Sequence, residues 1–336
     1  MTFMSETGSS GYPAGASRAS APLQMTPGRW VVLALTLPVA IALIGWTGFS
    51  FVSLVAQGSY SFRYPVPVDN GQVNVTFGGG NVTLRQASGS TAQVTGIVQY
   101  GLFRPGISEN VTPGGVYIGV NCDAINSNCG ANATLDVPAN TAVTASSGGG
   151  DIGVSGFSSG MTLSTVGGNL TASNLGGNLR LDTGGGDLTG TGLTGTINIT
   201  TEGGNVGASN VDGTAGTVRL DTGGGDLSTN GITGNLQFST EGGNVNANAV
   251  SSQQVTIASG GGDVTLAFSQ VPRNLRITAQ GGNINVILPP GDTKYDISTG
   301  AEGGNVNIPS ALASSTSPDK ISVDSGGGDI TITQAS

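Results

Sequence analysis

Short stretches in which hydrophobic and polar residues alternate recur along the second half of the chain. In each, two aliphatic or aromatic residues flank a residue that is mostly polar, as in Leu179-Arg180-Leu181. Because side chains alternate between the two faces of a β-strand, this pattern predicts strands with one buried face. The pattern recurs at Ile197/Ile199, Val218/Leu220, Leu236/Phe238, Val255/Ile257, Leu275/Ile277, Tyr295/Ile297 and Ile321/Val323.

A glycine-rich motif, Gly-Gly-Gly-Asp or Gly-Gly-Asn, follows these stretches. An aliphatic residue comes directly after it, so Leu188 follows Asp187 and Val206 follows Asn205. From Asp151 onward, the last residues of successive glycine motifs are 18, 18, 18, 21, 18, 19, 20, 22 and 24 residues apart. A short period of this kind is typical of solenoids. The glycine motifs end at Asn81, Asp151, Asn169, Asp187, Asn205, Asp226, Asn244, Asp263, Asn283, Asn305 and Asp329.

The fold class that this repeat predicts is all-β: a single-stranded parallel β-helix, or β-solenoid, of ~18–24-residue rungs over residues 141–336. One rung has too few aliphatic side chains to offset the entropy of ordering about twenty residues, so rungs must stack. Stacking places Leu181, Ile199, Leu220 and Phe238 in one interior column. The alternative is a β-sandwich of hairpins, which predicts turns every 8–12 residues or so.

The last residue of the glycine motif alternates between Asp and Asn from Asp151 to Asn283. If the rungs stack in register, these residues form a ladder, in which neighbouring carboxylates would repel each other. Alternation doubles the distance between charges, and each Asn amide can donate to the Asp beside it. We therefore interpret the ladder, which continues to Asn305 and Asp329, as a structural device.

Residues 30–56 contain no charged side chain and are rich in Val, Leu, Ile, Ala and Phe. As a helix they would span about 40 Å, more than the ~30 Å hydrocarbon core of a bilayer. This predicts a transmembrane helix over 29–57, preceded by a disordered cytoplasmic tail over 1–28. Arg18 and Arg29 favour a cytoplasmic N-terminus and an extracellular C-terminal domain in the cell membrane. The alternative is a signal peptide cleaved near Ala56.

Residues 58–140 form the N-terminal part of the expected ectodomain and depart from the repeat. The stretch 85–135 fits either a long loop or an N-terminal cap. Cys122 and Cys129 lie in it with six residues between them, which is not the spacing of a redox motif. Outside the cell they are expected to form a disulfide; in a cytosolic domain they would be free thiols.

The composition excludes much chemistry. The chain has no His, only 9% charged residues and a net charge of −9. A Ser-His-Asp triad and His-ligated metals are therefore excluded, and two cysteines cannot build a zinc site. The acidic balance disfavours nucleic acid as a partner. We expect no cofactor and no enzymatic activity.

Three specific activities fit the residues less well. Calcium-binding β-rolls use Gly-Gly-x-Gly-x-Asp, whereas here Asp directly follows the glycines. Polysaccharide-cleaving β-helices need clustered acids and bases, for which Arg180 with Asp182 and Arg219 with Asp221 are candidates, the alternative being ion pairs between rungs. Ice binding needs a regular Thr row, but the outward row here is irregular, reading Thr189, Gly207, Ser228, Asn246, Thr265, Asn285, Asn307 and Thr331.

The segment VPANTAVTASSGGGDIGVSG (137–156), followed by units such as LRLDTGGGDL and LQFSTEGGNV, resembles the bacterial putative-adhesin family, a β-strand-repeat domain of unknown function. The resemblance covers roughly residues 70–336. It implies a surface-exposed β-solenoid behind one membrane anchor, with no established catalytic residues to transfer. The Pro/Ser-rich tail and the single anchor resemble actinobacterial members.

Together these observations favour an adhesin, in which a long polar flank of Thr, Asn and Ser binds an unknown surface ligand or envelope component. An alternative is an envelope-stress sensor or signalling accessory that binds cationic peptides, since the chain after residue 57 contains 19 acidic and 9 basic residues. A third class is a structural envelope scaffold. The chain ends on a strand, ITITQAS, without an evident cap, which predicts self-association through that end of the solenoid.

Overall fold

The computed structural model describes residues 57–336, except 102, 113–114 and 122–128, together with Thr36, Val39 and Leu43. The chain divides into two compact units, Met1–Phe51 and Val52–Ser336. The predicted tail, and all but four residues of the predicted transmembrane segment, lie outside the described residues. Within the part of the chain that is described, no helix has the length and hydrophobicity needed to cross a membrane.

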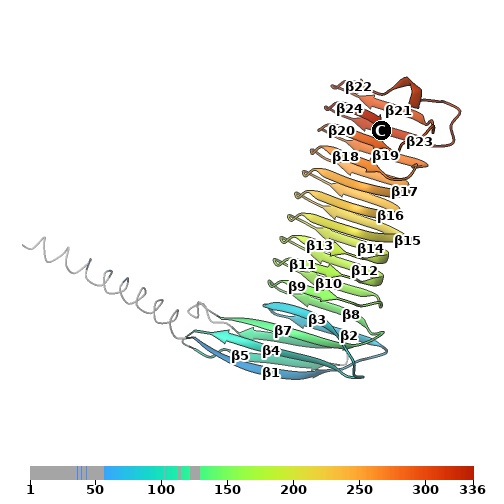
Figure 1. The fold of residues 1–336 in the computed structure, drawn as a ribbon. Coiled ribbons are helices and arrows are strands. Elements are labelled where there is room, and N and C mark those ends of the chain that lie inside the picture. The colour runs from blue at the N-terminus through green and yellow to red at the C-terminus, as the bar shows by residue number, and fades with distance from the viewer. Residues whose placement is uncertain are drawn as a thin grey trace, which may run out of the picture. The chain divides into compact units, whose positions relative to one another are not determined.

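The second unit contains a β-solenoid, as the repeat predicts (Figure 1). Each coil has one segment before its glycine turn and one after it, and equivalent segments stack in parallel. The segments before the turn form a first sheet whose order is β2 (Gln72–Phe77), β8 (Ala142–Ser147), β10 (Met161–Thr165), β12 (Gly176–Thr183), β14 (Thr194–Thr201), the C-terminal parts of β15 (Val206–Thr222), β16 (Leu227–Thr240) and β17 (Val245–Ser259), then β19 (Asn274–Ala279), β23 (Lys320–Ser325) and β21 (Asp296–Ala301).

The segments after the turn form a second parallel sheet. Strands β15, β16 and β17 take part in both sheets because each continues round a corner of the coil. The order in the second sheet is β3 (Asn81–Ala87), β9 (Ile152–Ser155), β11 (Leu170–Ser173), β13 (Leu188–Thr191), the N-terminal parts of β15, β16 and β17, then β18 (Val264–Phe268), β20 (Ile284–Leu288), β24 (Ile330–Gln334) and β22 (Val306–Asn307).

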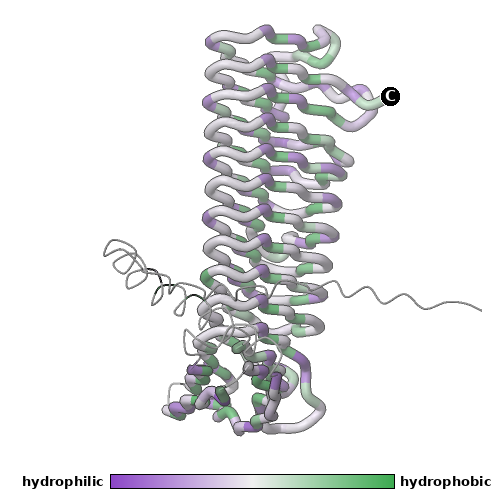
Figure 2. Tube along the Cα trace, turned by 90° about the vertical axis from the view of Figure 1, so that its left-hand side faces the viewer, coloured by the Kyte–Doolittle hydropathy of each residue, from purple (hydrophilic) through white to green (hydrophobic). Residues whose placement is uncertain are grey.

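The core consists of columns of equivalent side chains. Leu181 pairs with Ile199, Ile199 with Leu220, and Leu220 with Phe238, and each is at most 2% exposed. The predicted interior column is thus confirmed. In Figure 2, hydrophobic and hydrophilic positions recur at matching places in successive coils. In-register stacking is what turns the period of the sequence into one continuous interior.

The coils do not follow one another in sequence order at the C-terminal end. Strand β19 pairs with β23, and β23 pairs with β21; β20, β24 and β22 are related in the same way. The last coil in the sequence therefore lies between the two coils that precede it. The strand in ITITQAS is not the outermost one that the sequence predicts, because Ile330 and Thr331 pair with β22 as well as with β20, while Ile332–Gln334 pair with β20 alone. The free edge belongs to β21, where the segment around η1 (Ser310–Leu312) pairs only with Tyr295.

An N-terminal cap extends both sheets with antiparallel strands. Strand β1 (Gly58–Val66) pairs with β4 (Ala92–Tyr100), which pairs with β7 (Gly130–Pro138), and β7 adds to β3. Strand β5 (Gly106–Thr112) pairs with β6 (Gly115–Asn121), which adds to β2. The irregular stretch is thus largely a cap. The first coil, β2–β3, pairs directly with β8–β9, so the solenoid begins before the expected boundary at residue 141 and the cap strands β4–β7 are inserted between its first two coils.

Candidate functional site

The ladder residues lie over one another along one corner of the solenoid. The backbone N–H of Asn205 donates to Oδ1 of Asp187 (2.8 Å), and that of Asp226 donates to Oδ1 of Asn205 (2.9 Å). The Asn205 side-chain amide also donates to Oδ1 of Asp187 (3.2 Å). The same backbone contact continues through the order Asn81, Asp151, Asn169, Asp187, Asn205, Asp226, Asn244, Asp263, Asn283, Asp329 and Asn305.

The exchanged order of the last coils keeps the alternation of Asp and Asn unbroken in space. In the sequence Asn305 follows Asn283, which would place two Asn side by side. In the structure Asp329 lies between them: its N–H donates to Oδ1 of Asn283 (3.0 Å), and its own Oδ1 accepts the N–H of Asn305 (2.7 Å). The ladder side chains thus bond one coil to the next along the whole solenoid.

A column of buried hydroxyl groups lies behind the ladder, and the sequence analysis missed it. The Thr183 hydroxyl donates to the carbonyl of Gly168 in the preceding coil (2.7 Å) and accepts the N–H of Gly186 in its own turn (3.2 Å). It therefore links two coils through groups that would otherwise be buried and unpaired. The residue four positions before the ladder residue is Thr or Ser in most coils, which could have revealed the column; its members are Ser147, Thr165, Thr183, Thr201, Thr222, Thr240, Ser259 and Ser325.

The last glycine of each turn is fixed by the close approach of two coils. A Cβ on Gly186 would lie 2.1 Å from the carbonyl oxygen of Gly168, whereas a Cβ on Gly185 would meet nothing within 4 Å. Real Cβ atoms do not come as close as 2.1 Å to a backbone oxygen, so the stacking distance excludes any side chain at Gly186. We call the corner formed by the glycine turns and the ladder residues the turn corner. Its close packing makes it a structural device in which few substitutions fit.

No group of three or more His, Cys, Asp or Glu side chains in the described ranges could hold a metal ion. Cys129 is disulfide-bonded. Cys122 lies outside the described residues.

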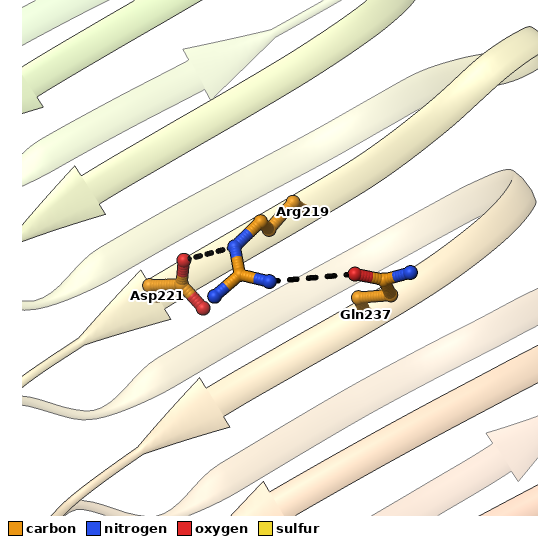
Figure 3. Close-up of polar contacts among 3 residues, drawn as sticks. All are labelled: Arg219, Asp221 and Gln237. Carbon is orange, nitrogen blue, oxygen red and sulfur yellow. Dashed lines mark hydrogen bonds and ion pairs between the residues drawn. The ribbon is translucent and has the colours of Figure 1, made fainter.

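The outer face of the first sheet carries two charged pairs. Arg180 contacts Asp182 (2.8 Å), and Arg219 contacts Asp221 (2.5 Å). Arg219 also donates to Oε1 of Gln237 on the neighbouring strand (3.4 Å; Figure 3). Each ion pair joins residues of one strand, so the expectation of ion pairs between rungs is wrong. Residues two apart on a strand point to the same side, which allows this contact.

Between the two pairs lies the coil of β14, which contributes Asn198 and Thr200. Asn198 pairs with both Arg180 and Arg219 in the sheet register, and Thr200 pairs with both aspartates. We call this set the Arg–Asp face: Arg180, Asp182, Asn198, Thr200, Arg219 and Asp221. Oδ1 of Asp182, Asn198 and Asp221 is buried, and none of the three has a hydrogen-bond partner among the described residues. The Arg–Asp face thus combines half-exposed guanidinium groups with unused acceptors.

A second surface lies on the cap. An open groove crosses β1, β4, β7 and β3, with Arg63, Thr95, Thr134 and Thr83 in one cross-strand row. The exposed side chain of Ile97 lies in the same groove. The Thr hydroxyls and the single guanidinium offer donors to a ligand, without the unused buried acceptors of the Arg–Asp face.

Comparison with known proteins places the chain in a family. No curated protein matches it. A putative cell adhesion protein from Clostridium sporogenes is similar in structure, with 14% identity and a TM-score of 0.22 over 83% of this chain and 100% of that chain. A putative adhesin from Parabacteroides merdae gives 10% identity and a TM-score of 0.28 over 84% and 97%. The model of the Toastrack DUF4097 family matches residues 107–336, and the chain belongs to that family.

Proposed function

We propose that this chain is a membrane-anchored protein of the cell surface that binds a ligand with an outer face of its solenoid and catalyses no reaction. The Arg–Asp face is the observation that carries the proposal, because it gathers charged and amide side chains on neighbouring strands held in register. A rigid sheet positions such groups without the entropy cost of ordering a loop. This gives the polar flank expected of an adhesin a defined location.

The aspartates of this face are poorly suited to catalysis. A hydrolase needs one carboxyl group to give up a proton and another to act as base or nucleophile. Asp182 and Asp221 instead each form an ion pair with an arginine on their own strand. Two carboxylates that are each engaged by an arginine support ligand binding rather than proton transfer.

The apolar stretch at 30–56 supports the anchor, and the few basic residues near its ends support a cytoplasmic N-terminus. The Pro/Ser-rich tail supports placement with actinobacterial members of the family. The test compares cells that display the full chain with cells that display a chain lacking residues 142–336, that is, every solenoid coil after the first. Attachment to host cells or envelope material is expected to fall to background without the solenoid. Unchanged attachment at equal surface levels would reject the proposed function.

A second candidate function is the capture of cationic peptides along the turn corner, as a sensor of envelope stress would require. Glu202 and Glu241 stand in turns next to the Asp187 and Asp226 turns, and those turns contain no Lys or Arg. Such a surface attracts cations at low salt. Binding of polylysine that is strong at 20 mM salt and lost at 500 mM would favour it; binding that is absent at both would exclude it. A purely structural scaffold predicts no ligand in either assay.

Self-association through the solenoid end, which the sequence predicts, would use β21. The N–H of Asp296 bonds to the carbonyl of Asp319, so the alternation of a parallel strand directs the backbone groups of Ile297 and Thr299 to the free edge. Replacing Thr299 with Pro would remove one donor from this edge. A dimer that dissociates in Thr299→Pro but persists in Ser298→Ala would support this contact; a monomeric wild-type chain at high concentration would rule it out.

A further inference from the structure

We propose that the ligand of the Arg–Asp face is a neutral, polyhydroxylated polymer, that is, a glycan chain lying across β12, β14 and β15. This inference rests on the proposed function and names the chemistry of its ligand. The argument uses the charge balance of the face, its unused acceptors and the spacing of its two charged pairs.

The charge balance favours a neutral ligand. The Arg–Asp face holds two guanidinium groups and two carboxylates, which are close together and cancel. A polycation would be attracted by the aspartates and repelled by the arginines, and a polyanion would meet the reverse. A hydroxyl group can donate to a carboxylate and accept from a guanidinium. A chain of hydroxyl groups therefore matches both kinds of side chain, whereas the turn corner with its carboxylates matches cations.

The unused acceptors call for donors from outside the protein. Oδ1 of Asp182 and of Asp221 is buried without a partner, and an ionised carboxylate can only accept hydrogen bonds. Leaving a buried acceptor unpaired is unfavourable, so a ligand that supplies a donor is favoured. The arginines paired with these aspartates are 56% and 52% exposed, which leaves their side chains room to rotate and admit a hydroxyl group. The remaining guanidinium N–H groups can then donate to other oxygens of the same ligand.

The spacing suits a polymer with a repeating unit. The pair on β12 and the pair on β15 are separated by the coil of β14, so equivalent side chains lie two coils apart, about 9.6 Å at the usual strand spacing. A polysaccharide built from a repeated unit presents the same hydroxyl groups at regular intervals. Asn198 and Thr200 fill the interval between the pairs with further hydrogen-bonding groups. A chain that follows the solenoid axis can thus engage both pairs at once.

The test measures cosedimentation of the full chain, in detergent, with insoluble polysaccharides. Cellulose, chitin and insoluble starch are separate arms, and soluble polylysine and polyglutamate are the charged arms. The test variant is Asp182→Ser with Asp221→Ser, because Ser164 and Ser239 already occupy the equivalent position in other coils. The matched control is Asp324→Ser, at the same position in β23 but outside the face. Circular dichroism and the melting temperature check that each variant is folded.

We expect binding to at least one of the three insoluble polysaccharides, weakened at least tenfold in the double variant and unchanged in the control. Equal binding by wild type and double variant would overturn the inference, as would binding to the charged polymers alone. The two proposals fail separately. If the double variant still attaches to cells while the solenoid deletion does not, the glycan inference falls and the proposed function stands. If the deletion attaches normally, the proposed function falls, and sedimentation alone decides whether the face binds glycans.

Discussion

The solenoid and the N-terminal cap solve the same packing problem in different ways. In the solenoid, each interior position repeats a similar side chain, such as Leu181, Ile199 and Leu220, and small residues fill the turns. In the cap, antiparallel strands bring together unlike neighbours, and aromatic side chains fill the space. Phe62 lies opposite Gly96, and Arg104 stacks 4.0 Å from the ring centre of Tyr60. Repetition lets small, uncharged residues build a core, whereas an unrepeated region needs large side chains matched one by one.

The largest expected effect is in the cap. Phe62 is 8% exposed, and its ring occupies the space left by the missing side chain of Gly96. Phe62→Ala should destabilise the cap by about 3–5 kcal/mol. Because coils contact only their neighbours, hydrogen exchange should accelerate in β1 and β4 and stay slow in β16. Val111→Ala, at an exposed cap position, is the control. Uniform acceleration along the whole chain would mean that cap and solenoid unfold as one unit.

In the solenoid, the turn glycines should differ sharply within one turn. Gly186→Ala forces a Cβ against the carbonyl of Gly168 and should cost about 3 kcal/mol in the free energy of unfolding. Gly185→Ala, one residue earlier, has open space and should leave stability unchanged or raise it by up to about 1 kcal/mol. Urea denaturation of both variants measures the difference. Similar losses in both would show that the coils do not stack as closely as described.

Two buried threonines offer a matched pair. Thr222 donates to the carbonyl of Gly204 (2.9 Å) and accepts the N–H of Gly225 (3.0 Å), whereas the hydroxyl of Thr229 is buried without a partner. Thr222→Val should cost about 2 kcal/mol, because it leaves two buried backbone groups unpaired. Thr229→Val should be neutral or stabilising. Thermal unfolding of the two variants decides; a larger loss at Thr229 would contradict the hydroxyl column.

The ladder predicts a smaller, salt-dependent effect. Asn205→Asp places a third carboxylate between Asp187 and Asp226 and removes the amide donor to Asp187. At one strand spacing in water, each like-charged neighbour costs about 1 kcal/mol. The loss should shrink in 1 M salt, which screens exposed charges. Asp187→Asn, which keeps an Oδ1 acceptor, should change stability little. A loss for Asn205→Asp that is the same in high salt would point to a cause other than charge.

The smallest expected effect is a titration. Hydrogen bonds from the Thr214 hydroxyl, the Thr214 N–H and the Thr233 hydroxyl lower the pKa of Asp212 below its ordinary value. A folded pKa below the unfolded one adds stability above the unfolded pKa, and that stability is lost as the pH falls through the folded pKa. Thr214→Ala should raise the pKa of Asp212 in an NMR titration. Thr256→Ala, in β17 and outside the hydrogen bonds of Asp212, should not change it.

The sequence predicts the repeated part of the fold well, because the same pattern of strand and glycine turn recurs in successive coils. The period-two strands predict the interior column, and the glycine motifs predict the position of the ladder. The hydroxyl column was visible in the sequence too, as Thr183 and its equivalents, but small polar residues near turns usually face water. Their burial follows only when a carbonyl of the preceding coil, such as that of Gly168, lies within reach.

The cap and the Arg–Asp face depend on contacts that no local pattern reveals. The partner of Phe62 is a glycine 34 positions away, and antiparallel pairing of unlike strands leaves no period to read. The alternation of Arg180 and Asp182 on one strand does predict that they share a face. Which oxygen is left without a donor depends on rotamers and on the coil between the pairs, so the sequence alone cannot give it.

The exchanged order of the last coils has a consequence for the biogenesis of the protein. During synthesis β21 and β22 emerge before β23 and β24, yet β23 and β24 separate them from β19 and β20. The native tip can close only after β24 has left the ribosome. A premature stop after residue 319 would therefore remove an inner layer and leave the outermost one, β21 and β22, without its support.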